Sequence, residues 1–189
     1  MNTMPEPYLS SPDLPFDPHG WFFNQKPLEE CLLSNPKTVI EVGSWLGAST
    51  RFIAERLSSG SKLYAVDTWK GSIEHTDDPR LPHLYSLFLS NVKHAKLTHV
   101  IIPVRMESLE AARQLNIKAD LIYIDGAHDT KSAYEDIISW YDHLNPGGIL
   151  CGDDFKWGTV HEAVVHAAIA LKQTIEVQDN FWKFSTEEK

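Results

Sequence analysis

From about residue 27 onward, short apolar runs alternate with segments of helical periodicity. Each run is short enough for one strand and almost continuously apolar, as in strands covered on both faces. The runs are Thr38–Val42, Lys62–Val66, Val100–Val104, Ala119–Ile124 and Gly148–Cys151. Between them, apolar residues in 134–144 and 160–171 recur with the spacing of amphipathic helices. The alternation predicts βαβ units and therefore an α/β fold with a parallel sheet.

Three other segments complete the predicted organisation. Asn145-Pro146-Gly147-Gly148 is expected to end the helix before it and to turn the chain into the next strand. Residues 174–185 contain two β-like runs around a polar turn, which predicts an antiparallel hairpin at the sheet edge. Residues 71–82 are polar and predict a loop, and a loop of that length is often functional.

Residues 1–19 are rich in proline, which favours an extended arm over regular structure. This arm is either a frayed terminus or a segment that packs on a partner subunit or covers a site. Residues 20–189 are then expected to form one domain.

Composition narrows the class of protein. The chain has 189 residues, 42% of them hydrophobic, and a formal net charge of −9, which indicates an acidic globular domain. The negative charge disfavours binding to nucleic acid or anionic lipid. No apolar run reaches the roughly 18 residues of a membrane span, and no signal peptide is evident at the N-terminus. Cys31 and Cys151 are too few for a disulfide framework, so we expect a cytoplasmic protein.

A glycine-containing turn follows the first predicted strand, where α/β sheets bind cofactors. Gly43 allows a ligand close to the backbone, and Gly47 allows the next helix close to the strand. Ser49 and Thr50 open that helix, where free N–H groups attract an anion. The motif lacks the middle glycine of the dinucleotide fingerprint, which disfavours NAD and FAD.

The same turn carries a family resemblance. Glu41 leads an E-x-G-x-x-x-G sequence with Ser44 and Trp45 inside it, and this resembles motif I of class I S-adenosylmethionine-dependent methyltransferases. In that family the turn accommodates the methionine part of the cofactor. The alternative is a tight strand-to-helix turn without a ligand.

The ends of the next two predicted strands extend this interpretation. Asp67 ends the second strand, where a carboxylate can accept hydrogen bonds from both ribose hydroxyls. The alternative is an ordinary turn aspartate at the end of the strand. The candidate cofactor-binding residues around these strand ends are Asp67, Thr68, Trp69, Met106, Glu107 and Ser108. The resemblance places the last three at the adenine, although Met106 is equally consistent with a core position.

Carboxylates and one histidine follow the fourth and fifth strands. Asp125, Asp153 and Asp154 are expected to converge, because adjacent parallel strands lie about 4.8 Å apart. A hard divalent cation would remove the repulsion between them, which predicts a Mg²⁺-type site. Asp125 is also a cofactor-binding candidate. Alternatively, the acidic pair caps a helix or faces solvent. His128 lies three residues beyond Asp125 and is the candidate general base, unless it is merely exposed.

Further motifs in the same order make the resemblance more specific. They are VDTWKG at 66–71, FLSNV at 88–92, IDGAH at 124–128, NPGG at 145–148 and the aspartate pair at 153–154. Over roughly residues 37–185 the chain resembles the metal-dependent O-methyltransferases of the macrocin and mycinamicin type. The resemblance implies a Rossmann-like, doubly wound, mostly parallel sheet with a C-terminal antiparallel hairpin, in three αβα layers. It also implies S-adenosylmethionine at the switch point and Mg²⁺ at the fourth and fifth strand ends.

Residue by residue, Asp125 matches the family's first metal aspartate, Asp153 and Asp154 match its acidic pair, and His128 matches its proposed base. Asp153 departs from the pattern, because glutamate often stands at that position. The sequence shows no counterpart of the family's large N-terminal extension. We therefore expect the cover of the substrate site to come from the 71–82 loop, the arm or a second subunit of a homodimer.

The sequence therefore predicts S-adenosylmethionine-dependent, Mg²⁺-assisted methyl transfer to a hydroxyl of a small molecule: a sugar, a polyketide or a phenol. Some aromatic residues near the expected cleft could stack on that acceptor or belong to the core. They are Trp21, Phe22, Trp69 and Trp157. One alternative is a cephalosporin-hydroxylase-like enzyme on the same fold, and the other is a silent S-adenosylmethionine-binding module.

Overall fold

The computed structural model describes residues 4–185, apart from the side chains of residues 73 and 185. Residues 1–3 of the predicted arm and 186–189 of the predicted domain lie outside the described residues. The strands are β1 Thr38–Val42, β2 Lys62–Asp67, β3 Ile101–Arg105, β4 Ala119–Ile124, β5 Leu144–Gly152, β6 Thr174–Gln178 and β7 Phe181–Ser185. The helices are α1 Gln25–Leu32, α2 Ala48–Ala54, α3 Leu84–His94, α4 Ser108–Gln114, α5 Thr130–Tyr141 and α6 Gly158–Leu171.

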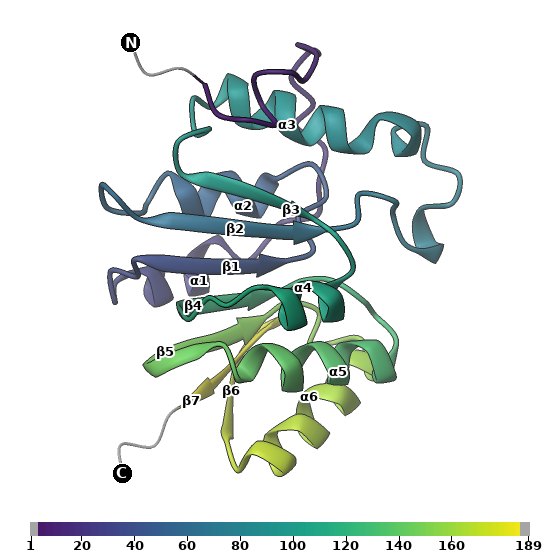
Figure 1. The fold of residues 1–189 in the computed structure, drawn as a ribbon. Helices are drawn as coiled ribbons and strands as arrows, with labels where there is room; N and C mark the ends of the chain where they lie inside the picture. The colour runs from purple at the N-terminus through teal and green to yellow at the C-terminus, as the bar shows by residue number, and fades with distance from the viewer. Residues whose placement is uncertain (1–3, 186–189) are drawn as a thin grey trace.

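All seven strands form one sheet in the order β3-β2-β1-β4-β5-β7-β6. Strands β1 to β5 are parallel, and β7 runs antiparallel between β5 and β6 (Figure 1). The sheet confirms the predicted Rossmann-like architecture and its closing hairpin. The strand order reverses at β1 and β4, so a ligand is expected beyond the carboxyl ends of these strands.

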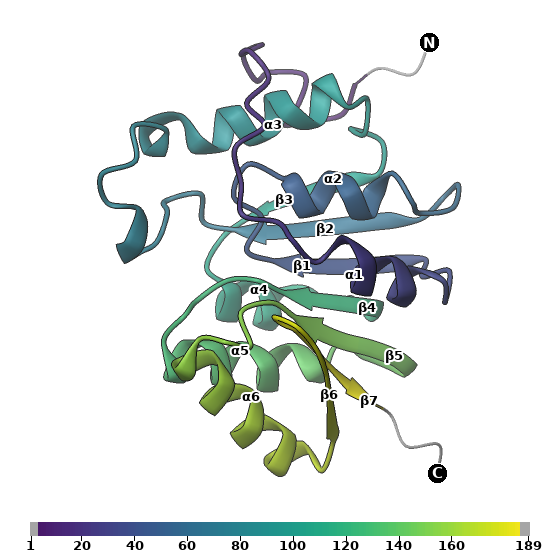
Figure 2. The same ribbon diagram turned by 180° about the vertical axis from the view of Figure 1, so that it is seen from behind.

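Helices cover both faces of the sheet, because successive strand residues point to opposite sides. Val39 of β1 belongs to the core with α1, α2 and α3, whereas its neighbour Ile40 belongs to the core with α4, α5 and α6. The two helical layers can be followed in Figure 1 and, from behind, in Figure 2. Both sides of the central strands are therefore dry, which explains their continuous apolarity.

The prediction that Asn145–Gly148 ends a helix is wrong. Helix α5 already ends at Tyr141, and the proline and glycines lie inside β5. From the pair Ala119–Leu144 to the pair Leu121–Ile149, β4 advances two residues while β5 advances five. The segment is thus an irregularity in the strand, a place where proline and glycine are tolerated within a sheet.

The described part of the N-terminal arm packs on its own chain. Tyr8 is buried, and its hydroxyl donates to the Ile101 carbonyl at 2.9 Å. Further along, the Leu14 backbone N–H donates to Ser90 and that of Asp17 donates to Asn91, both on α3. The arm therefore runs along α3 (Figure 2). None of the helices within residues 4–185 is long and apolar enough to cross a membrane.

Candidate functional site

The glycine turn between β1 and α2 brings two strand ends together. Gly43 has a φ of +86°, and a Cβ atom there would lie 2.0 Å from the Asp125 carbonyl oxygen. Gly47 has a φ of +78° and precedes the first residue of α2. A larger residue at position 43 would separate β1 from the segment after β4, so glycine is required for their contact.

Glu41 stabilises this turn from below. It is fully buried, and its carboxylate accepts hydrogen bonds from the hydroxyls of Ser44 and Ser49 at 2.6 Å each and from Thr50. Burial raises the pKa of Glu41, while the three hydroxyl donors oppose that rise. The carboxylate therefore holds the turn rather than facing the space above it.

Asp67 connects the end of β2 to the same turn. Its Oδ2 accepts the backbone N–H groups of Ser44 and Trp45 at 2.9 Å each, and its Oδ1 accepts that of Trp69 at 2.7 Å. Burial raises the pKa of Asp67, and these N–H donors lower it. Trp69 is buried against Tyr85 and Phe88, and its indole N–H donates to the Trp45 carbonyl.

Two adjoining cavities open above the turn. The larger has a volume of about 420 Å³ and the smaller about 240 Å³, and Trp45, His75 and Asp125 line both. Of the residues predicted to bind the cofactor, the larger is also lined by Gly43, Ser44 and Ser49. The smaller is lined by Asp67, Thr68, Met106, Glu107 and Ser108. Glu41, Gly47, Thr50 and Trp69 line neither of these two cavities and lie in the supporting structure.

The floor of the larger cavity is acidic. Asp125, Asp153 and Asp154 all line it, as predicted from the ends of β4 and β5. Burial, together with Asp153 and Asp154, raises the pKa of Asp125 well above its usual value. Asp154 has a φ of +61°, a conformation that is uncommon outside glycine and concentrates at functional turns.

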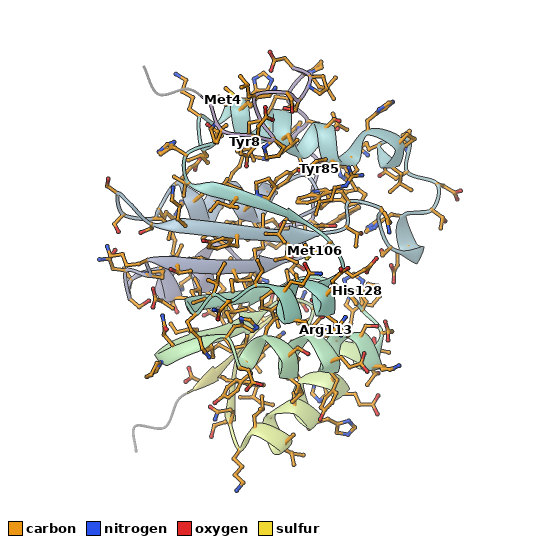
Figure 3. The ribbon with its side chains drawn as sticks, in the orientation of Figure 1. Met4, Tyr8, Tyr85, Met106, Arg113 and His128 are labelled. Atoms are coloured by element: carbon orange, nitrogen blue, oxygen red, sulfur yellow. The ribbon has the colours of Figure 1, made fainter. Side chains whose placement is uncertain are left out.

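His128 lies beside this floor, on the side of the molecule toward which the parallel strands point, as does Met106 (Figure 3). Its Nε2 is 2.9 Å from Asp154 Oδ2, and this hydrogen bond is the main reason that the pKa of His128 is raised. Its Nδ1 is buried without a hydrogen-bond partner among the described residues, 3.7 Å from Glu74 Oε1. Because Asp154 accepts from Nε2–H, Nδ1 is the nitrogen left to accept a proton.

The three aspartates do not close into a metal site in their observed positions. Among the described residues, no group of three or more histidines, cysteines, aspartates or glutamates is placed to hold a metal ion. Instead, Asp154 pairs with His128, and the Asn180 amide donates to both Asp153 and Asp154. The chemistry of the donors still fits a hard cation, because crowded carboxylates repel one another and no lysine or arginine is among the described residues of the cavity lining.

An aromatic roof covers the larger cavity. The rings of Trp21 and His75 stack at 5.1 Å, and His75 lies 4.4 Å from the Trp45 ring. Arg80 pairs with Asp17 at 2.8 Å, which links the loop that carries His75 to the N-terminal arm. The sequence left three possible sources for the cover of the site. In the described residues, the cover comes from the 71–82 loop and from residues 20–23, which follow the arm.

Sequence reasoning missed several lining residues. Phe23, Glu74, His75 and Asn180 all line the larger cavity. Asn180 belongs to the predicted hairpin turn and Glu74 to the predicted loop. The sequence therefore predicted the turn and the loop, but not that these side chains point into the cavity. Of the four aromatic residues predicted near the cleft, Trp21, Phe22 and Trp157 line the larger cavity, whereas Trp69 is buried in the core.

Comparison with known proteins agrees with this geometry. The Methyltransferase domain family matches residues 40–155, more than half of the chain. No curated protein matched the sequence.

Solved structures share the fold at low identity. An O-methyltransferase from Bacillus cereus in complex with SAH is 16% identical with a TM-score of 0.64, covering 86% of this chain and 80% of its own. The O-methyltransferase TomG from Streptomyces achromogenes, in complex with SAM, is 14% identical with a TM-score of 0.67, covering 87% and 80%. The SAH-bound methyltransferase PaMTH1 from Podospora anserina is 14% identical with a TM-score of 0.65, covering 85% and 76%. The chain therefore belongs to the methyltransferase domain family and is a class I S-adenosylmethionine-dependent methyltransferase.

Proposed function

We propose that this enzyme transfers the methyl group of S-adenosylmethionine to a hydroxyl oxygen of a small molecule, with His128 as the general base. The contact between His128 Nε2 and Asp154 Oδ2 carries this proposal, because it leaves Nδ1 as proton acceptor beside the larger cavity. Two of the structural neighbours are themselves O-methyltransferases, which supports oxygen as the acceptor atom.

The two cavities together offer room for the cofactor and for the acceptor. The smaller cavity, with Asp67, Thr68 and Met106, would take the nucleoside of the cofactor. The larger would take the methionine end beside Gly43 and the acceptor beside His128. In the reaction the oxygen–carbon bond forms as the carbon–sulfur bond breaks, and the hydroxyl proton passes to His128 Nδ1. The protein contributes mainly alignment and a base.

Mg²⁺ assistance is part of the proposal. Asp125, Asp153 and Asp154 would hold the ion, and their burial and mutual repulsion in the cavity floor support this assignment. Bound there, a divalent cation would supply Lewis acidity to the acceptor hydroxyl. The acceptor class (sugar, polyketide or phenol), a homodimer and a cytoplasmic location also remain proposals.

Calorimetric titration with S-adenosylmethionine, followed by transfer of labelled methyl to a panel of hydroxylated sugars, polyketides and phenols, tests the function. We expect binding and a product heavier by one CH₂ group. A product heavier by one oxygen would indicate the hydroxylase alternative, and binding without any turnover would indicate a silent module.

Chelation tests the metal separately. EDTA treatment and Asp125→Asn should both lower turnover, and added Mg²⁺ should restore only the EDTA-treated enzyme. Full activity after EDTA would contradict metal assistance and leave methyl transfer itself in place.

A further inference from the structure

The lining of the larger cavity is rich in negatively charged side chains. Four carboxylates line it, those of Glu74, Asp125, Asp153 and Asp154, and no lysine or arginine is among its described lining residues. In the adjoining loops, Arg80 is paired with Asp17 and Asp78, and Lys156 is paired with Asp179. An anionic group on an acceptor would therefore meet four carboxylates and no lysine or arginine in the described lining.

Glu74 is the carboxylate to which the proposed chemistry gives neither a metal-binding role nor the proton, although it lies against the base and helps to raise its pKa. It lies in the roof, in a single turn of 3₁₀-helix at Ile73–His75, and its Oε1 is 3.7 Å from His128 Nδ1. A hydrogen bond with Ser72 lowers the pKa of Glu74, so it is ionised at neutral pH. Even if the three aspartates were neutralised by a cation, the Glu74 charge would remain next to the base.

Aromatic faces accompany this charge. Trp21 is 52% exposed and Trp157 is 46% exposed, although both line the cavity. The Trp157 ring lies 4.6 Å from that of His128, and the Trp21 ring stacks on His75, the neighbour of Glu74. Exposed indole rings near a carboxylate can bind an organic ammonium group, through attraction to the ring and to the opposite charge.

We propose that the acceptor carries a protonated amine near its reactive hydroxyl, that Glu74 binds this amine with Trp21 and Trp157, and that anionic acceptors are rejected. This inference rests on the proposed function, since it concerns the substrate of the same site. Glu74 would then determine specificity by binding the amine, without itself accepting the hydroxyl proton.

Shape-matched ligands of different charge test the proposal. Dopamine, 4-ethylcatechol and 3,4-dihydroxyphenylacetate share a catechol ring, and glucosamine, glucose and glucuronate provide the same series for a sugar. Binding to the full chain in the presence of S-adenosylhomocysteine is measured by calorimetry. We expect the amine of at least one series to bind about tenfold tighter than the carboxylate, a size suited to one partly exposed charge.

Variants assign the effect to Glu74. Glu74→Gln should reduce this preference to about twofold or less, and Glu74→Lys should reverse it. Glu55→Gln, an exposed glutamate after α2, is the matched control and should retain the full preference. Thermal unfolding of each variant confirms that the loop change has not unfolded the protein.

Equal or tighter binding of the carboxylates, a preference unchanged in Glu74→Gln, or no binding in either series would overturn the inference. Methyl transfer is assayed in parallel with labelled donor. Transfer to the carboxylate as efficient as to the amine would refute the charge selection and leave the proposed function standing. Tighter binding of the amine without any methyl transfer would support the charge selection and contradict the proposed function.

Discussion

At the scale of single residues, the site depends on groups whose ionisation is set by their neighbours. His128 is held by Asp154 through Nε2, so the basicity of its other nitrogen depends on a residue from the next strand end. Asp154 and Trp45 adopt positive φ angles beside the cavity, at φ +61° and +46°. Such conformations cost free energy and persist where surrounding contacts enforce them.

His128→Ala should lower kcat by about 10²-fold or more, because it removes the proton acceptor. The affinity for S-adenosylmethionine should stay within about twofold, since that side chain is not among those lining the smaller cavity. Steady-state kinetics and calorimetry measure the two effects. His166→Ala, an exposed histidine on α6, is the control. Lost cofactor affinity in His128→Ala would instead identify His128 as structural.

Asp136, buried on α5, should make stability depend on pH. Burial raises its pKa from 3.8 to about 6. The folded state therefore favours the protonated form, and the stability that this proton contributes is present at about pH 4 and lost as pH rises through about 6.

Asp136→Asn should therefore be more stable than the wild type at about pH 8, by up to roughly 3 kcal/mol, with the difference shrinking toward about pH 4. Denaturant unfolding at several pH values measures it. The exposed Asp142→Asn, just after the same helix, should show no such trend. An equal gain at both pH values would contradict the titration of Asp136.

At the scale of elements, the loop that carries His75 and the segment that carries Trp21 cover the larger cavity, and the arm holds the loop in place. The Arg80–Asp17 pair is half-buried and connects segments far apart in sequence, while Asn91 of α3 donates to the Asp17 and Leu46 carbonyls. Helix α3 thus supports both the arm and the glycine turn. The β6–β7 hairpin contributes in the same way, since Asn180 at its turn bridges the two aspartates after β5.

Arg80→Ala should loosen the roof with little loss of global stability, about 1 kcal/mol or less, because a partly exposed ion pair contributes little. We expect faster limited proteolysis within residues 12–24 and a higher KM for the acceptor. Arg56→Ala breaks a comparable pair with Glu29 away from the cavities and serves as the control. Unchanged proteolysis and KM in Arg80→Ala would contradict the coupling between arm and loop.

At the scale of the whole molecule, residues from near both ends of the chain, from Gly20 to Asn180, line the larger cavity. We therefore expect one subunit to form a working site. We expect specific activity to stay constant on dilution through any monomer–dimer transition, as followed by activity assays and analytical ultracentrifugation. Activity lost in step with dissociation would mean that a partner contributes to the site.

The sequence by itself determined the fold class and which candidate residues lie at the strand ends. Continuous apolar runs and helical periods predicted the strands and the main helices, because burial imposes those patterns locally. The glycine turn, Asp67, Asp125, His128 and the aspartate pair were found because strand ends in a parallel sheet meet at one edge.

Tertiary structure alone decided where these side chains point and what they contact. Glu41 turned inward to three hydroxyls, Trp69 joined the core, and Asn145–Gly148 entered β5 rather than ending a helix. Glu74 and Asn180 reached the cavity from a loop and a hairpin turn. Side-chain direction at such positions depends on contacts distant in sequence, which no local pattern records. The residues that cover the larger cavity, and the number of carboxylates in its lining, were therefore visible only in the folded chain.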